Sequence, residues 1–169
     1  VYGMMNETED LNKGIDNYKN LPDAKLDALK RIISKVHEQG NGKLIVFALF
    51  KNTLKYLNIR LKAAGYNCVM IHGEIGNIKE REEVIESFKN DPSISILLSS
   101  EVGSEGLDMQ FCNTIVNYDL PWNPMVVEQR IGRVDRFGQE SEVVNIYNIV
   151  VKGSIQEQIY LRLLERIGI

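Results

Sequence analysis

Five short apolar runs constrain this chain more than any other feature of its sequence. They cover residues 43–49, 67–71, 93–99, 114–118 and 143–150. An uninterrupted apolar run of this length is typical of a strand buried on both faces, as strands are in parallel sheets. Because helix-like or glycine-bearing stretches separate the runs, the sequence predicts an α/β fold, with a mainly parallel sheet and helices on both faces.

The intervening stretches carry apolar residues at three- and four-residue steps, which is the spacing of one helix face. Asn77, with Glu80 three residues later, has the pattern of a helix start closed by a capping box. The predicted helices cover residues 23–40, 52–64, a stretch from Asn77, a stretch from Asn123, and 154–167. Residues 1–22 are polar and acidic, and we expect them to form a linker or tail from an upstream domain. Residues 23–169 are then one domain.

Composition narrows the class of protein. Of 169 residues, 44% are apolar and 25% charged, which is enough for one real core, and no apolar run approaches the length of a membrane span. Cys68 and Cys112 lie far apart within apolar runs, which indicates reduced core cysteines and favours the cytoplasm. A net charge of −3 lacks the basic excess of a stand-alone nucleic-acid binder. The first residue is valine, and we expect a piece of a longer protein.

Segments with residues that could do chemistry follow the first three predicted strands, at 50–52, 72–73 and 100–108. In parallel sheets ligands collect at the carboxyl ends of the strands, so these segments are candidates for a site. In the loop 100–108 two glycines permit close backbone approach, Ser100 and Ser104 can meet phosphate oxygens, and Asp108 can accept hydrogen bonds from a ribose. A tight connection without a ligand explains this loop equally well. A lone histidine such as His72 is more often structural.

The stretch 126–139, VVEQRIGRVDRFGQ, follows a helix-start signal at Asn123-Pro124. On a continuous helix Gln129, Arg133 and Arg136 would share one face, with Gly132 clearing space between them. Two arginines and a glutamine aimed together suit a polyphosphate. The alternative is a solvated arginine-rich helix. Trp122, just before this stretch, is expected to pack between loop and helix, with nucleobase stacking as the alternative.

Several kinds of site are missing from the sequence. The nearest candidate for a phosphate-binding P-loop, residues 40–43, precedes a strand instead of following one and is followed by leucine. No strand ends in a carboxylate pair suited to magnesium, no dinucleotide fingerprint fits, and no Ser-His-Asp or Cys-His arrangement is recognisable. We therefore expect no metal site on this chain.

Taken together, these residues resemble the second, C-terminal RecA-like domain of superfamily-two helicases, within the Swi/Snf-type ATPases. The match runs over residues 23–148, and KLIVFALFKNT resembles the strand that opens this domain. The run SEVGSEGLDMQF, then DLPWNP and the arginine-rich stretch, is most similar to the bacterial RapA-type branch. The resemblance implies a three-layer RecA-like fold, related to the P-loop NTPases. Many superfamily-two members have a basic residue at Glu105, and many Swi/Snf members have asparagine at Asp108.

The resemblance implies one half of an ATP-dependent helicase or translocase. Arg133 and Arg136 would act as arginine fingers toward ATP held by a separate N-terminal RecA-like domain, which would also hold Mg²⁺, and Gln129 would help to position the phosphate or the attacking water. The implied contacts to the nucleotide are Gly106, Asp108 and Glu105. This chain alone would then be inactive.

The resemblance also implies contacts to a nucleic-acid backbone, which would need no reading of bases. These residues are Lys51, Asn52, His72, Gly73, Arg81 and Ser100. The implied partners are the N-terminal domain, double-stranded DNA and RNA polymerase, without a membrane, in the bacterial cytoplasm or nucleoid. The alternatives are a catalytically retired helicase-like module that binds nucleic acid or RNA polymerase, and a flavodoxin-like small-molecule domain.

Overall fold

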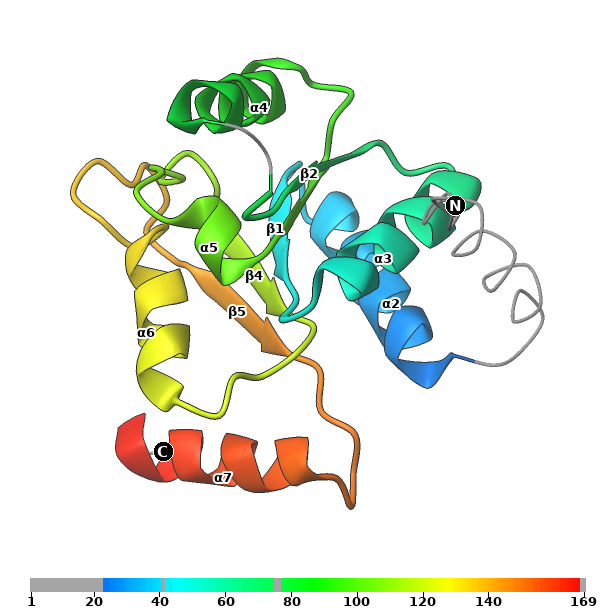
Figure 1. Ribbon diagram of the computed structural model, residues 1–169, viewed down its shortest axis with the longest axis vertical. Helices are drawn as coiled ribbons and strands as arrows, with labels where there is room; N and C mark the ends of the chain where they lie inside the picture. The colour runs from blue at the N-terminus through cyan, green and yellow to red at the C-terminus, as the bar shows by residue number, and fades with distance from the viewer. Residues whose placement is uncertain (1–22, 41, 75–76, 168–169) are drawn as a thin grey trace, which may run out of the picture.

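A computed structural model describes residues 23–40, 42–74 and 77–167 (Figure 1). The linker or tail expected over residues 1–22 lies outside this range. The strands are β1 (Leu44–Phe47), β2 (Cys68–Ile71), β3 (Ile96–Ser99), β4 (Thr114–Asn117) and β5 (Asn145–Asn148). The helices are α2 (Ala24–Glu38), α3 (Lys51–Ala63), α4 (Ile78–Asn90), α5 (Glu101–Ser104), α6 (Pro124–Gly132) and α7 (Ile155–Ile167).

The five strands form one sheet in the order β2-β3-β1-β4-β5, and every neighbouring pair is parallel. The central strand β1 is in register with both neighbours, so that Val46 lies opposite Leu98 on one side and Val116 on the other. All five carboxyl ends therefore lie at one edge of the sheet, here called the carboxyl edge. The predicted α/β class with a parallel sheet is confirmed.

Two apolar clusters fill the two faces of the sheet. On one face α2 and α3 pack Leu29 and Leu57 against Val46. On the other face α4 packs Phe88 in a cluster that also contains Phe47 and Val134. Helices therefore cover both faces, which gives the three layers predicted (Figure 1). A third, small cluster joins α6 to α7 and includes Val127 and Leu163.

Short polar side chains cap the helices α2, α4 and α6. Asp23 Oδ1 accepts a hydrogen bond from the Leu26 amide at 2.9 Å, and Asn77 Oδ1 accepts one from the Glu80 amide at 3.1 Å. Asn123 Oδ1 accepts one from the Met125 amide at 3.0 Å, with proline in the first turn of α6. These caps satisfy amides that have no partner within the helix. The starts predicted at Asn77 and Asn123 are confirmed.

The chain differs from the prediction at the end of α6. This helix ends at Gly132, and residues 133–138 form a succession of turns and bends, here called the arginine turn. The amides of Val134 and Asp135 both donate to the Ile131 carbonyl, and this tightening carries Val134 into the core beneath the sheet. The prediction that Gln129, Arg133 and Arg136 share one face of a continuous helix is wrong, because burial of Val134 turns the backbone.

The predicted loop at residues 100–108 also contains regular structure, the four-residue helix α5. Trp122 does not pack between loop and helix as expected, since 71% of its surface is exposed. No helix in the described part of the chain is both long enough and apolar enough to cross a membrane.

Candidate functional site

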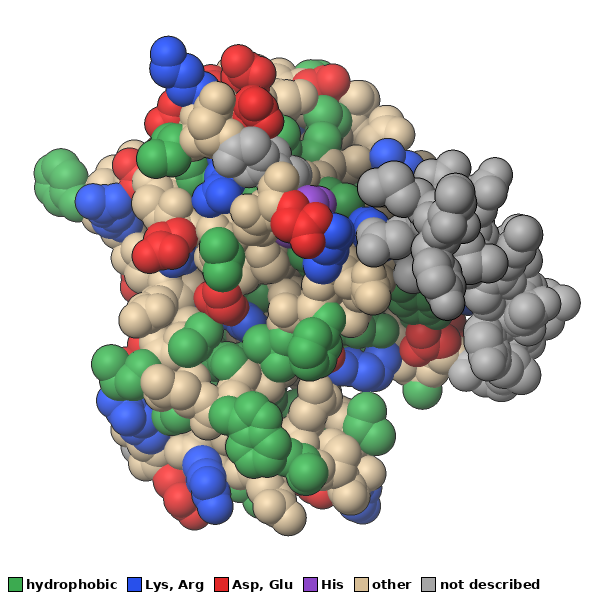
Figure 2. All heavy atoms as spheres, in the orientation of Figure 1, with side chains coloured by type: hydrophobic (Ala, Val, Ile, Leu, Met, Phe, Trp, Pro, Cys, Tyr) green, Lys and Arg blue, Asp and Glu red, His purple; other side chains and the backbone are tan. Residues whose placement is uncertain are grey.

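The carboxyl edge is hollowed where β1, β2 and β3 end. A groove of about 240 Å³ lies there, on the face that Figure 2 shows. It collects four residues predicted from the resemblance to contact nucleic acid, which are far apart in the sequence: Lys51, His72, Gly73 and Ser100. Leu49, Glu74, Glu101 and Val102 complete its lining. We call this hollow the groove.

The charges of the groove are partly paired. Lys51 forms an ion pair with Glu74, and this hydrogen bond is the main reason why the pKa of Glu74 lies below its usual range. His72 accepts a hydrogen bond at Nδ1 from the Glu74 amide at 3.3 Å. Burial, and then the nearby Lys51 ammonium, lower the pKa of His72 below its ordinary value. His72 is therefore neutral at pH 7 and adds no charge to the groove.

Arg81 joins α4 to the groove wall. Its guanidinium donates to the Val102 carbonyl at 3.1 Å and to the Gly73 carbonyl at 3.2 Å. The structure thus places Arg81 beside the predicted set. Asn52, by contrast, lies in the first turn of α3 with its side chain exposed, and it does not line the groove.

Helix α5 forms one wall of the groove and is locked by its own side chains. Ser100 caps it, because Ser100 Oγ accepts a hydrogen bond from the Gly103 amide at 3.1 Å. Gly103 packs so closely on the end of β2 that a Cβ atom there would lie 2.7 Å from the Ile71 carbonyl oxygen. Ser104 is fully buried, and its hydroxyl donates to the carbonyls of Ser100 and Glu101. The expectation that Ser104 meets phosphate oxygens is wrong, because its hydroxyl completes this helix.

The arginine turn lies against the far end of α5. Arg133 Nη1 donates to the Ser104 carbonyl at 2.7 Å, and the Arg133 carbonyl accepts from the Met109 amide at 3.3 Å. Arg136 forms an ion pair with Asp108, and both side chains are about 60% exposed. The structure therefore brings both predicted finger arginines to the segment 104–108.

The other residues predicted at the nucleotide are exposed around this contact. Gly106 has a φ of +78°, a conformation that glycine adopts readily, and it gives the turn after α5 its shape. Glu105 is exposed in the same turn, and Gln129 is exposed on α6. Because the helix ends at Gly132, Gln129 does not share a helix face with the two arginines.

One side chain fixes the end of the arginine turn. Gln139 Nε2 donates to the carbonyls of Cys112 and Val134, each at 3.0 Å, and Gln139 Oε1 accepts from the Ser141 amide at 3.0 Å. Three directed hydrogen bonds hold this residue in one place. The turn that carries Arg133 and Arg136 is therefore fixed at both ends, by α6 and by Gln139.

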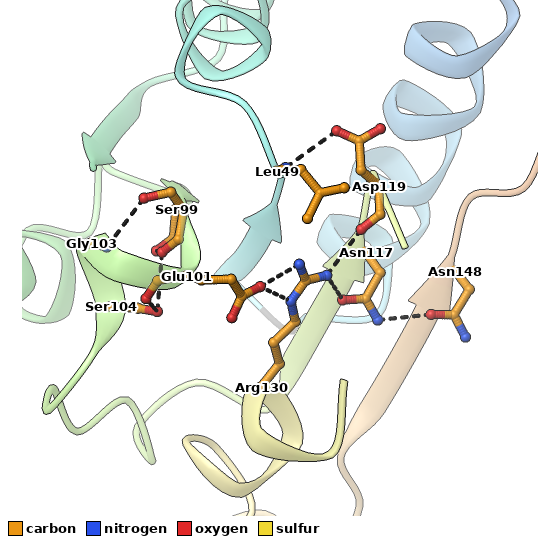
Figure 3. Close-up of polar contacts among 10 residues, drawn as sticks. Leu49, Ser99, Glu101, Gly103, Ser104, Asn117, Asp119, Arg130 and Asn148 are labelled. Carbon is orange, nitrogen blue, oxygen red and sulfur yellow. Dashed lines mark hydrogen bonds and ion pairs between the residues drawn. The ribbon is translucent and has the colours of Figure 1, made fainter. Parts of the chain in front are cut away.

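Sequence reasoning missed Arg130, the largest fully buried side chain in the described part of the chain (Figure 3). Its guanidinium forms an ion pair with Glu101, lies 4.9 Å from the centre of the Phe47 ring, and donates to Asn117 Oδ1 at 2.6 Å and to the Asp119 carbonyl at 3.0 Å. Burial lowers the pKa of this guanidinium, and the Glu101 carboxylate opposes that shift.

The polar contacts around Arg130 extend across the carboxyl edge. Asn117 Nδ2 donates to Asn148 Oδ1 at 2.7 Å, which joins β4 to β5. The Asp119 carboxylate accepts from the Leu49 amide at 3.4 Å and pairs with Lys25 at 2.8 Å. A signal for Arg130 was present in the sequence, since it lies three residues after Val127 and four before Val134, which is the spacing of one helix face.

The described residues include no group of three or more histidine, cysteine, aspartate or glutamate side chains that could hold a metal ion. They do suit an anionic ligand at the arginine turn. Arg133 Nε is buried and has no hydrogen-bond partner among the described residues. A guanidinium with an unused donor beside a second arginine can donate hydrogen bonds to phosphate oxygens after a small shift of its side chain.

Comparison with known proteins gives a family and several relatives. The model of the helicase conserved C-terminal domain matches residues 24–138. An uncharacterized ATP-dependent helicase, YqhH, of Bacillus subtilis is 40% identical over 127 residues, which cover 75% of this chain and 22% of the relative. The RNA polymerase-associated protein RapA of Vibrio parahaemolyticus is 36% identical over 127 residues, 74% of this chain and 13% of the relative. This chain thus spans about a fifth or less of these proteins.

A more distant relative and a solved structure agree with this match. The DNA repair and recombination protein RAD54B of Mus musculus is 32% identical over 148 residues, which cover 86% of this chain and 16% of the relative. The crystal structure of the C-terminal part of the Fun30 ATPase domain superposes with a TM-score of 0.77 at 27% identity. The superposition covers 92% of this chain and 53% of that structure.

Proposed function

The chain belongs to the helicase conserved C-terminal domain family, and on that premise we propose that it supplies the arginine fingers of an ATP-dependent helicase or translocase. ATP would be bound mainly by a separate N-terminal RecA-like domain. The named relatives support ATP use, since YqhH is called an ATP-dependent helicase. The alternative of a retired module is not favoured by any observation, because both arginines are present and fixed.

One observation carries this proposal: Arg133 and Arg136 converge on the segment 104–108 from a turn that is held at both ends. Neither arginine contributes to the apolar core, so folding alone does not explain why both lie there. Arg133 keeps a buried Nε without a partner among the described residues, and the Arg136 guanidinium pairs with an exposed carboxylate. The Arg136 guanidinium is therefore accessible to a ligand, and Arg133 keeps one donor that a ligand could use after its side chain shifts.

The chemistry of the two arginines follows from their fixed positive charge. In phosphoryl transfer negative charge spreads over the transferred group, and guanidinium groups set in place beforehand stabilise it without reorganisation. Gln129 would orient the phosphate or the attacking water, and Gly106, Asp108 and Glu105 would lie beside the nucleotide. Mg²⁺ would be held by the N-terminal domain.

We further propose that the groove holds the sugar-phosphate backbone of double-stranded DNA. Lys51, His72, Gly73 and Ser100 line it, Arg81 flanks it, and Asn52 lies on the adjacent turn of α3. Such contacts position a strand without reading its sequence. RAD54B is named for DNA repair and RapA for association with RNA polymerase, which supports DNA as the track and RNA polymerase as a partner.

We also propose that residues 23–169 form the C-terminal domain, that residues 1–22 lead in from the N-terminal one, and that the protein acts in the bacterial cytoplasm or nucleoid. Cys68 and Cys112 are buried and free, as suits a reducing compartment.

The test uses Arg133→Ala and Arg136→Ala in the full-length protein. Each variant should lower the kcat of nucleic-acid-stimulated ATP hydrolysis by roughly 10³-fold or more, the size known for arginine fingers. Arg31→Ala is the matched control, because Arg31 is an exposed arginine on α2, on the opposite face of the sheet. Unchanged hydrolysis in both finger variants would overturn the proposal.

A further inference from the structure

Arg130, which is fully buried, pairs with the partly buried Glu101 between α6 and α5, and the fold alone does not require this pair. Arg130 is 0% exposed and lies on a stripe of α6 that is otherwise apolar. Resting on the proposed function above, we infer that Arg130 and Glu101 are positioning residues that set Arg133 at its reacting position. Neither residue touches the nucleotide in this scheme.

The geometry supports this role because α6 meets α5 at two points. Arg130 contacts the carboxylate of Glu101, the first residue of α5, and Arg133 contacts the carbonyl of Ser104, the last residue (Figure 3 shows the first contact). Two contacts at opposite ends of so short a helix fix both its position and its direction. A change at the Glu101 end therefore moves the carbonyl that Arg133 uses.

The backbone makes a second link between the two arginines. The Arg133 amide donates to the Arg130 carbonyl at 3.3 Å, so the two residues share the last turn of α6. Arg130 is itself held by Asn117 and by the Asp119 carbonyl, at 2.6 and 3.0 Å. These contacts with β4 and the residues after it fix the rotation of the last turn of α6. The position of Arg133, in the same turn, is fixed with it.

Stability alone is a poor explanation for the pair. Taking a guanidinium and a carboxylate out of water is costly, and apolar residues of similar volume often stabilise such a position equally well. Directed hydrogen bonds, however, fix an orientation that apolar packing leaves free. The pair therefore adds orientation more than stability, which gives the experiment its design.

The decisive variant replaces both partners, Arg130→Met with Glu101→Leu, in the full-length protein at saturating DNA. We expect a Tm close to that of the unaltered protein and a KM for ATP within about twofold, because the core stays filled and the nucleotide contacts remain. We expect kcat to fall roughly 10²-fold, the loss typical when a reacting group is misplaced by about 1 Å. Unchanged kcat with native Tm would overturn the inference.

A single variant guards against failure of the double variant to fold. Glu101→Gln keeps the shape and one acceptor but removes the charge, and we expect a smaller fall in kcat, about tenfold, again without a change in KM. Native kcat in this variant would also overturn the inference.

Arg133→Ala, measured in parallel, separates the two proposals. If Arg133→Ala leaves kcat unchanged, the arginine-finger function itself fails. If Arg133→Ala lowers kcat while the Arg130 and Glu101 variants do not, only the positioning role fails. A fall in kcat without a change in KM in all three variants supports both proposals.

Discussion

Arg130 and Arg136 lie six residues apart, yet their surroundings are opposite. Arg130 is completely buried, with a carboxylate, an amide oxygen, a carbonyl and an aromatic ring around it. Arg136 is 60% exposed, and its guanidinium pairs with Asp108, which is as exposed as itself. The buried arginine anchors α6, whereas the exposed one remains available to a ligand.

This difference teaches that one short arginine-rich stretch can serve two purposes at once. The last turn of α6 needs a fixed position, and the surrounding β4 and α5 supply it through directed hydrogen bonds. On the proposed function the arginine turn presents its charge to a ligand, and its two arginine side chains make fewer contacts than Arg130 does. The comparison can be tested by changing each region separately.

The largest effect should be the difference in stability between truncating Arg130 and truncating Arg136. Arg130→Ala leaves Glu101 beside a cavity without its partner, so we expect the free energy of unfolding to fall by about 3–5 kcal/mol, as when one member of a buried ion pair is removed. Arg136→Ala removes only an exposed pair, which is worth less than about 1 kcal/mol. Urea denaturation of the isolated domain, followed by circular dichroism, measures both. Similar losses in the two variants would contradict the comparison.

A smaller effect should distinguish two glycines. Gly103→Ala would place a Cβ atom 2.7–2.8 Å from backbone atoms of Ile71 and His72, so we expect overpacking to cost about 1–3 kcal/mol. Gly132→Ala meets no atom within 4 Å and lies in a helix, where alanine is favoured by up to about 1 kcal/mol. Thermal unfolding of each variant gives the stability change.

Gly132 adds a functional contrast to this pair. Since the described chain leaves space there, any requirement for glycine must come from the nucleotide or the other domain. We therefore expect Gly132→Ala in the full-length protein to be as stable as its parent yet several-fold slower in ATP hydrolysis. Full activity would show that the space beside the arginine turn is unused.

The smallest effect concerns His72, which lines the groove. Its pKa is lowered by burial and by the cations Lys51, Lys55 and Arg81, while Glu74 opposes them. At a pH below about 6.5, the ordinary pKa of histidine, the ring takes up a proton more readily when a phosphate lies beside it than when the groove is empty. We expect DNA affinity of the full-length protein to rise about two- to fivefold between pH 7.5 and 5.5, as for one partly exposed ion pair.

The effect of lower pH on the stability of the domain is opposite to its effect on DNA affinity. Because the unfolded chain binds this proton more tightly than the folded one, the domain loses stability as pH falls below 6.5. His72→Gln should abolish the pH-dependent part of DNA binding, whereas His37→Gln, at the exposed other histidine, should retain it. Fluorescence anisotropy with a labelled duplex measures both. Equal pH dependence of DNA binding in the two variants would show that His72 does not contribute to it.

The fold could be predicted from the sequence because its signals are local. Each apolar run has to be buried on both faces, and the helix starts at Asn77 and Asn123 are written in the capping residues themselves. The segment 104–108 and the arginines 133 and 136 could also be singled out, since residue types and order carry that motif. The structure then brought them together, through Ser104 and Asp108.

The environment of each arginine could not be predicted, because it depends on distant elements. Whether residue 130, 133 or 136 enters the core is decided by where β4 places Asn117 and where α5 places Glu101. The end of α6 depends in the same way on the space beneath the sheet that Val134 fills. Trp122 was wrongly expected to pack, since an aromatic residue in the sequence does not reveal whether any surface lies opposite it.

The parallel sheet has a practical consequence at its opposite, amino edge. Every residue proposed to meet ATP or DNA lies outside residues 64–67, 91–95 and 140–144, the short segments that lead directly into β2, β3 and β5. Reporter groups attached there, such as a dye at the exposed Glu142, would follow movement of the domain while leaving its working surface untouched. Because all five strands share one direction, the proposed sites gather at the carboxyl edge of the sheet and the amino edge is left for labels.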